Sequence, residues 1–189
     1  MDATPALPHR RSIRLKGHDY ASPGAYFITI LAHERKCLFG EVVFGNMKLS
    51  GLGQLVNNCW LEIPRHFPSV ELRPHVLMPN HFHGIILIRN RPPQGAVSPA
   101  TPTPAEAFGK PIVGSLPTIV RSFKSAVTRR AGELLGMQGV KIWHRNYFEH
   151  IIRNKDDFLK TVRYIHDNPR RWEFDSENPF GRPREELIF

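Results

Sequence analysis

One stretch constrains this chain more than any other: residues 74–89, PHVLMPNHFHGIILIR. Two apolar runs flank a Pro79-Asn80 turn signal, a pattern typical of two adjacent strands. Side chains alternate between the faces of a strand and rise about 3.3 Å per residue, so we expect His81 and His83 on one face, roughly 6–7 Å apart, and Phe82 on the other. Two such imidazoles can hold one metal ion. For an isolated His-x-His pattern, however, two histidines on the solvated face of an edge strand are the commoner explanation.

The composition bounds the class of protein. The chain has 189 residues, 41% of them hydrophobic, which suits one domain with a substantial core. A formal net charge of +9 favours a polyanionic partner, nucleic acid before an anionic membrane. No stretch approaches the roughly 20 apolar residues that cross a bilayer, and the N-terminus lacks the apolar core of a secretory signal. Cys37 and Cys59 do not form the pattern of a disulfide framework, so we expect a reduced, cytoplasmic protein with no membrane partner.

Periodicity predicts the order of the elements. Strands are expected at residues 25–32, in a small hairpin turning at Gly45-Asn46, at 72–78, at 81–88 and within 142–152. Ser50, Ser115 and Asn154 can cap three helices, and Pro64 should end or kink the first. The first two helices carry apolar stripes at helical spacing: Leu55, Val56, Cys59, Trp60 and Ile63, then Ile119, Val120, Phe123 and Val127.

The composition also suggests how the domain is divided. Residues 1–22 form a basic, flexible arm, residues 23–175 the domain, and residues 176–189 a tail, with a Pro-rich loop at about 91–110. Basic side chains gather in two places, Arg14 and Lys16 in the arm and Arg121, Lys124 and Arg129 on the second helix. We expect them to contact DNA phosphates, although a merely solvated basic face is about equally compatible with the pattern.

The third helix, from residue 155 to about 167, carries the most informative tyrosine. Its apolar stripe is Phe158, Leu159, Val162 and Ile165, and at 100° per residue Tyr164 lies on the opposite side, together with Thr161 and Asn168. Pro169 disfavours helical geometry at Asn168, which is therefore expected to be the last helical residue or the cap. A tyrosine on the polar side of a packed helix is available for chemistry.

A phenol needs help to react, because with a pKa near 10 only about one part in a thousand is ionised at pH 7. His81, His83 and an amide oxygen, completed by water, can hold Mg²⁺ or Mn²⁺. Such an ion would polarise a phosphate, and attack by Tyr164 would leave a phosphotyrosine and a free 3′-hydroxyl. That covalent link retains the bond energy, so a second strand end can be joined without ATP.

Three segments, MPNHFHG, IWHRNYFEHIIRN and TVRYIHDNP, together resemble the single-tyrosine HUH transposases (histidine–hydrophobe–histidine), especially those of the REP-associated type. The resemblance runs from about Gly24 to Trp172. It implies an α+β fold with a ferredoxin-like antiparallel sheet and helices on one face (the HUH endonuclease fold), a homodimer, and cleavage of single-stranded DNA near hairpins through a 5′-phosphotyrosine. By position, His81 and His83 match the metal ligands and Tyr164 the nucleophile. Asn168 falls where some relatives have a glutamine ligand, one methylene longer.

Alternatives stay open at this point. Tyr147 is the rival nucleophile, although Trp143 and Phe148 beside it favour packing or base stacking. His75 could be structural or could support the metal ligands. His144 and His150 flank the aromatic segment, and His150 could approach a phosphate, although a hydrogen-bonded boundary histidine is the better explanation. The protein could also be a regulator that binds hairpin DNA or RNA without cutting it, or a metal-dependent nuclease that uses water as the nucleophile.

Overall fold

The structure is a computed structural model that describes residues 15, 17–90 and 112–181. Arg14, Lys16 and the Pro-rich loop at 91–110 lie outside the described residues, so the predictions for them stay predictions. The elements follow in the order β1 (Gly24–Leu31), η1 (His33–Arg35), β2 (Gly40–Val43), β3 (Asn46–Leu49), α1 (Gly51–Leu61), α2 (Ile63–His66), β4 (Val70–Leu77), β5 (His81–Ile88), α3 (Leu116–Leu135), β6 (Phe148–Ile152), α4 (Lys155–Asp167) and η2 (Pro169–Phe174).

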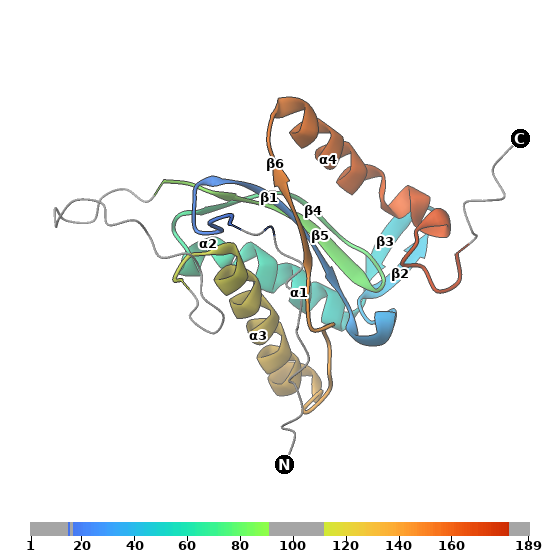
Figure 1. The fold of residues 1–189 in the computed structure, drawn as a ribbon. Coiled ribbons are helices and arrows are strands. Elements are labelled where there is room, and N and C mark those ends of the chain that lie inside the picture. Colours follow the sequence, from blue (N-terminus) through green and yellow to red (C-terminus); the bar gives the residue numbers. More distant parts are fainter. Residues whose placement is uncertain (1–14, 16, 91–111, 182–189) are drawn as a thin grey trace, which may run out of the picture.

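Four strands form one antiparallel sheet in the order β4-β5-β1-β6 (Figure 1). Strands β2 and β3 form the expected small hairpin, which turns at Phe44-Gly45, one residue before the predicted Gly45-Asn46. Strands β1 and β4 run in the same direction with β5 between them, and α1 connects β1 to β4. In the same way, β5 and β6 run in the same direction with β1 between them, and α3 connects β5 to β6. This is the split βαβ arrangement of a ferredoxin-like fold. The predicted fold class is confirmed.

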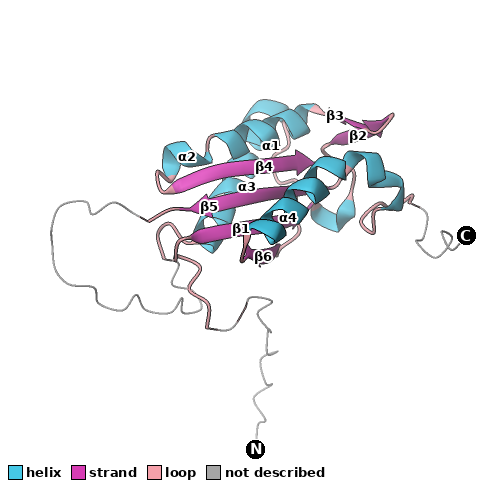
Figure 2. Ribbon diagram, turned by 90° about the horizontal axis from the view of Figure 1, so that it is seen from above, coloured by secondary structure: helices cyan, strands magenta, loops and turns pink. Residues whose placement is uncertain are grey.

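The two faces of the sheet carry different helices. Phe82 of β5 packs against Trp60 of α1 and Phe123 of α3, with ring centroids 4.5 Å and 5.8 Å away. Gly84 lies on the same face, and a Cβ there would come within 2.7 Å of the Trp60 ring, so only glycine lets the indole lie against the strand. Helix α4 covers the other face (Figures 1 and 2). Helices therefore lie on both faces rather than on one.

The helix starts were predicted well because capping is local. The Ser50 hydroxyl accepts a hydrogen bond from the Gly53 amide at 3.0 Å, and the Asn154 side chain accepts one from the Asp157 amide at 2.9 Å. The apolar stripes predicted for α1 and α3 are buried. Pro64 falls in the short α2, directly after the end of α1, as expected. No helix within the described ranges is long and apolar enough to cross a membrane.

Strand β6 is shorter than the strand expected within 142–152. Ile142 is buried and Trp143 forms only an isolated bridge with Ala32, while the regular ladder with β1 begins at Phe148. Between them, the carbonyls of His144 and Arg145 accept hydrogen bonds from Lys124 Nζ, at 2.7 Å and 3.2 Å. The Lys124 side chain therefore binds main-chain carbonyls in a stretch that forms no regular ladder.

The packing face of α4 is rotated from the predicted one. Ile165 of the predicted stripe is buried at 2% exposure, but Leu159 of the same stripe is 40% exposed. Thr161 and Asn168, predicted to lie opposite the stripe, are buried at 8% and 3% exposure. Thr161 and Asn168 do share a side of the helix with Tyr164, but that side faces the sheet. The hydroxyl of Thr161 donates to the Asp157 carbonyl, so its burial leaves it bonded. The sheet surface below is partly polar, which explains the choice of face.

Both predicted domain boundaries lie too far inward. Tyr20, placed in the flexible arm, is 4% exposed and donates a hydrogen bond to Glu149 at 2.8 Å. At the other end, Glu177 and Asn178, placed in the tail, make hydrogen bonds to Asn80 and Trp172. The packed domain therefore includes residues on both sides of the predicted 23–175.

Candidate active site

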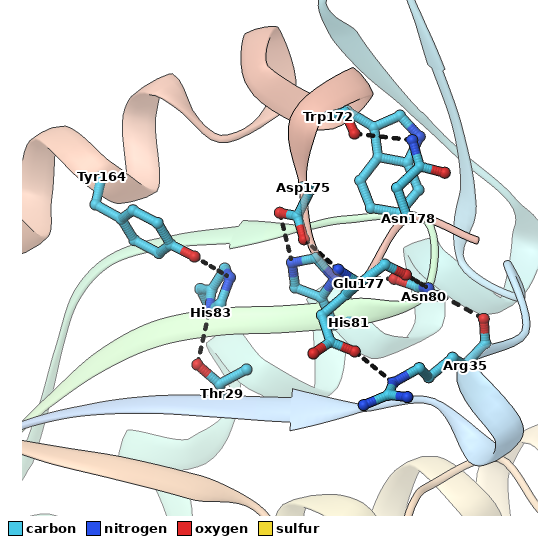
Figure 3. Close-up of polar contacts among 10 residues, drawn as sticks. All are labelled: Thr29, Arg35, Asn80, His81, His83, Tyr164, Trp172, Asp175, Glu177 and Asn178. Carbon is cyan, nitrogen blue, oxygen red and sulfur yellow. Dashed lines mark hydrogen bonds and ion pairs between the residues drawn. The ribbon is translucent and has the colours of Figure 1, made fainter. Parts of the chain in front are cut away.

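His81 and His83 point from β5 toward α4, as the strand alternation predicted, with ring centroids 4.5 Å apart (Figure 3). Their exposures are 0% and 4%, so they do not lie on the solvated face of an edge strand. Strands β4 and β1 flank β5, and Phe82 points to the opposite face. The pair is held rigidly inside the fold.

Tyr164 brings the third group to the same place. Its hydroxyl lies 3.3 Å from Nε2 of His83, and its ring meets Phe27 edge-on at 5.9 Å (Figure 3). All four tyrosines of the chain are among the described residues: Tyr20, Tyr26 and Tyr147 are buried, while Tyr164 is 45% exposed. Tyr164 therefore combines contact with the histidines and access from solvent, within a single chain.

The environment of His83 keeps it neutral. Burial, and then the neighbouring His81, hold the pKa of His83 well below its usual range. Nδ1 lies 2.8 Å from the Thr29 hydroxyl, and the Phe27 ring stacks on the imidazole at 5.3 Å. In the tautomer with the proton on Nδ1, that nitrogen donates to Thr29, and Nε2 has its lone pair directed toward Tyr164.

His81 is surrounded by acceptors. Burial lowers its pKa to about 4, an effect that the charge of Glu177 and a contact with Asn168 partly offset. Nδ1 lies 2.9 Å from the side-chain oxygen of Asn80. Nε2 is buried without a hydrogen-bond partner in the described part of the chain, and a carboxylate oxygen of Asp175 lies 3.8 Å from it. That distance is too long for a hydrogen bond.

Asn168 is the C-cap of α4, as expected, and keeps helical backbone angles although Pro169 follows. Its side-chain oxygen, like Nε2 of His81, is buried and makes no hydrogen bond of normal geometry among the described residues, although the two residues interact closely enough to raise the pKa of His81. Buried polar atoms in native proteins are rarely left without a partner, so two such atoms at one site need an explanation. A cation would satisfy both.

The donor set fits a divalent cation. Nε2 of His81, Nε2 of His83 and the Asn168 oxygen are the ligand types expected for Mn²⁺, and less well for Mg²⁺, which prefers oxygen. In the described residues no group of three His, Cys, Asp or Glu side chains could by itself hold a metal ion. The amide of Asn168 and water are therefore needed to complete the coordination.

The residues predicted to contact DNA are not all placed near this site. Arg121 and Arg129 are exposed on α3, across the sheet from Tyr164, and Arg129 pairs with Glu133 at 3.1 Å. Lys124 is held by the two carbonyls of the 144–145 segment, and burial lowers its pKa to about 8. Other exposed arginines belong to the Tyr164 layer: Arg163 on α4, and Arg170 and Arg171 on η2.

The rival histidines and tyrosine have structural surroundings. Tyr147 is 8% exposed and belongs to the core cluster. His75 Nε2 lies 2.9 Å from the Asn57 side-chain oxygen on the α1 face of the sheet, and His150 pairs with Asp157 at 2.9 Å. The His144 side chain is exposed, and its main-chain amide donates a hydrogen bond to the carbonyl of Leu31 in β1. None of these side chains is brought to the His81–His83 pair.

Sequence reasoning missed four residues of the site. Thr29 and Asn80 contact the two histidines directly, while Asp175 and Glu177 arrive from the segment after η2. The position of Asn80 directly before His81 could have indicated a contact with that histidine, but Asn80 was interpreted only as a turn residue. Thr29 could have been found only from the register that pairs it with His83.

The arrangement of sheet and helices is similar to that of solved structures. The REP-associated tyrosine transposase, solved bound to a REP hairpin, superposes with a TM-score of 0.55 at 21% identity, over 86% of this chain and 74% of that one. A proposed transposase of Deinococcus radiodurans R1 gives a TM-score of 0.44 at 16% identity, over 82% of this chain and 98% of that one. The chain has the fold of the REP-associated tyrosine transposase.

At the level of sequence, no family model matches the chain. A protein of Haemophilus influenzae strain Rd, described as uncharacterized, is 41% identical over 172 residues, which are 89% of this chain and 93% of the relative. The chain belongs to one family with that Haemophilus influenzae protein.

Proposed function

We propose that the protein is a metal-dependent transposase that cleaves and rejoins single-stranded DNA near hairpins through a 5′-phosphotyrosine. The observation that carries the proposal is that the hydroxyl of the partly exposed Tyr164 lies 3.3 Å from His83, one of two buried neighbouring histidines. The fold and the three sequence motifs support the same class. The solved relative binds a REP hairpin, which makes hairpin DNA the first substrate to test.

The reaction assigns a role to each residue. The Tyr164 oxygen attacks the phosphorus and loses its proton. The bond between phosphorus and the 3′-oxygen of the preceding nucleotide breaks, and this oxygen takes up a proton to become a hydroxyl. In the reverse direction, the 3′-hydroxyl of another strand end displaces the tyrosine and restores the phosphodiester. Because Tyr164 reaches the histidines within one chain, the attack can occur in cis, whether or not the predicted homodimer forms.

The residues that would hold Mg²⁺ or Mn²⁺ are His81, His83 and Asn168. When bound, the ion would supply Lewis-acid polarisation of the phosphate and charge stabilisation during in-line attack. Asn80 and Thr29 orient the two imidazoles by hydrogen bonds to their Nδ1 atoms, at 2.9 Å and 2.8 Å. Phe27 stacks on His83 and touches Tyr164, so it restricts both rings.

Trapping the covalent intermediate tests the proposal. The protein is incubated with labelled hairpin DNA carrying a single-stranded flank and with Mn²⁺, then analysed under denaturing conditions. We expect a protein–DNA adduct from the wild type, none from Tyr164→Phe, and an adduct from the matched control Tyr147→Phe. Cleavage without an adduct would instead support the water-dependent nuclease, and binding without cleavage would support the non-cutting regulator.

A further inference from the structure

Asn80 is a wholly buried side chain between the histidine pair and the segment after η2 (Figure 3). Its Nδ2 donates to the main-chain oxygen of Arg35 at 3.0 Å and to that of Glu177 at 2.6 Å. Carbonyl oxygens only accept hydrogen bonds, so the amide nitrogen must lie on that side. The reverse orientation would place the side-chain oxygen against two other oxygens.

The orientation of Asn80 determines the proton position on His81. With Nδ2 engaged, the Asn80 oxygen faces His81 Nδ1 at 2.9 Å and can only accept, so Nδ1 carries the hydrogen. A neutral imidazole has one N–H, and its Nε2 then has a free lone pair. The contact with Thr29 does not determine the tautomer of His83 in the same way, because a hydroxyl can both donate and accept a hydrogen bond.

The carbonyls that hold Asn80 are themselves fixed. Glu34 and Arg35 have left-handed backbone angles, φ 54° and φ 52°, which are costly for residues other than glycine. The Arg35 guanidinium pairs with the Glu177 carboxylate at 2.6 Å, so the segment after η2 is fastened to η1 directly beside Asn80. This frame is built from two segments about 140 residues apart in the chain.

Building on the function proposed above, we propose that Asn80 is a positioning residue: it locks His81 in the Nδ1–H tautomer, so that the Nε2 lone pair is presented to a divalent cation. The frame of Arg35 and Glu177 keeps Asn80 in the orientation that does this. The segment after η2 is in this way part of the active site.

Nitrogen NMR of the metal-free, DNA-free protein tests the lock directly. Long-range ¹H–¹⁵N spectra at pH 7 distinguish the two tautomers of a neutral imidazole, and the His81 signals are assigned by their loss in His81→Asn. We expect the proton of His81 on Nδ1. A proton on Nε2 in the wild-type protein would overturn the proposal, regardless of how any variant folds.

Asn80→Ala then tests the consequence. We expect the Nε2–H tautomer of His81 to become populated and Mn²⁺ affinity to fall about tenfold or more, the range for orienting partners of metal ligands. The matched control is Asn57→Ala, which removes an equivalent amide from His75 on the opposite face of the sheet and should change neither readout. If Asn80→Ala does not fold, Asn80→Ser is measured with the same expectation. An unchanged tautomer and affinity would contradict the proposal.

These outcomes are separable from those of the transposase reaction. A covalent adduct together with an Nε2–H wild-type His81 would reject the positioning role alone. The expected tautomer together with no adduct would reject the strand-transfer reaction alone.

Discussion

At His83, two interactions compete for one lone pair. The Tyr164 hydroxyl lies 3.3 Å from Nε2, the nitrogen that would also bind a cation. An imidazole nitrogen has a single lone pair in the ring plane, so it cannot accept a hydrogen bond and ligate a metal together. Cation binding should therefore release the phenol from His83.

Tyr164→Phe should for this reason abolish the covalent adduct without weakening the metal site. We expect Mn²⁺ affinity to stay the same or to rise by up to roughly tenfold, because the hydrogen bond that is removed contributes about 0.5–1.5 kcal/mol. Isothermal titration calorimetry without DNA measures this, with Tyr147→Phe as the control. Tenfold weaker binding in Tyr164→Phe would show that the phenol supports the cation rather than competing with it.

At the scale of elements, Lys124 connects α3 to the segment before β6. Its ammonium donates to the carbonyls of His144 and Arg145, and the main-chain oxygen of Lys124 accepts from the Trp143 indole at 3.2 Å. A solvated face of α3 would leave such a lysine mobile. Here it anchors the chain that leads into β6.

Lys124→Ala should consequently act on stability rather than on DNA binding. We expect the free energy of unfolding to fall by about 1–2 kcal/mol, since two main-chain carbonyls lose their donor. Urea denaturation measures this, with the exposed Arg121→Ala as the control, expected within about 0.5 kcal/mol of wild type. If Lys124→Ala left stability unchanged but made DNA binding weaker and less dependent on salt, the result would instead support the phosphate contact predicted from the sequence.

At the scale of the whole molecule, the sheet separates two basic surfaces. Helices α3 and α4 lie on opposite faces of the sheet (Figure 2). Arg121 and Arg129 belong to α3, Arg163 belongs to α4, and Arg170 and Arg171 belong to η2, which follows α4 in the chain. DNA that reaches Tyr164 must approach from the α4 side. Charges on that side are therefore better placed to neutralise its phosphates.

Paired substitutions compare the two surfaces. Arg170→Ala with Arg171→Ala should weaken hairpin binding and reduce the slope of log K against log salt by about 1.4–1.8, at roughly 0.7–0.9 for each phosphate contact. Arg121→Ala with Arg129→Ala should have the smaller effect. Fluorescence anisotropy at several salt concentrations measures both. A larger loss from the α3 pair would mean that the DNA wraps around to the far layer.

The buried histidines also set a pH dependence for the whole fold. The pKa of His81 is lowered by burial from 6.5 to about 4, and that of His83 is lowered well below 6.5. Between the folded and unfolded pKa values, the unfolded chain binds more protons, so stability is lost as the pH falls below about 7. His81 alone accounts for a loss on the order of 3 kcal/mol by about pH 4.

Denaturation of the metal-free protein at pH 7.5, 6 and 5 measures this loss. The pH range avoids most carboxylate titration, so a decline there reports the histidines. We expect His81→Gln to flatten the curve, because the glutamine does not titrate. A wild-type stability that stays constant from pH 7.5 to 5 would show that the histidines can be protonated without unfolding.

Much of the fold and half of the site followed from local rules. Strand alternation placed His81 and His83 on one face and Phe82 on the other, and capping chemistry placed the starts of α1 and α4. These features depend on a few consecutive residues, so the sequence contains all the information they need. Helical phase and the family motifs together indicated Tyr164 and Asn168, which the structure brings beside the pair.

Only the tertiary structure decided the rest. The polar side of α4 packs against the sheet because Tyr164 finds a hydrogen-bond partner there in His83. The apolar residues Phe158 and Leu159 alone did not predict this orientation, and Leu159 is exposed. Lys124 became an anchor, and Asn80 an orienting amide, through carbonyls far away in the chain. Thus the amino-acid sequence by itself determined which residues can ligate and react. Hydrogen bonds between distant segments determined how those residues are oriented, since backbone carbonyls carry no signature in the sequence.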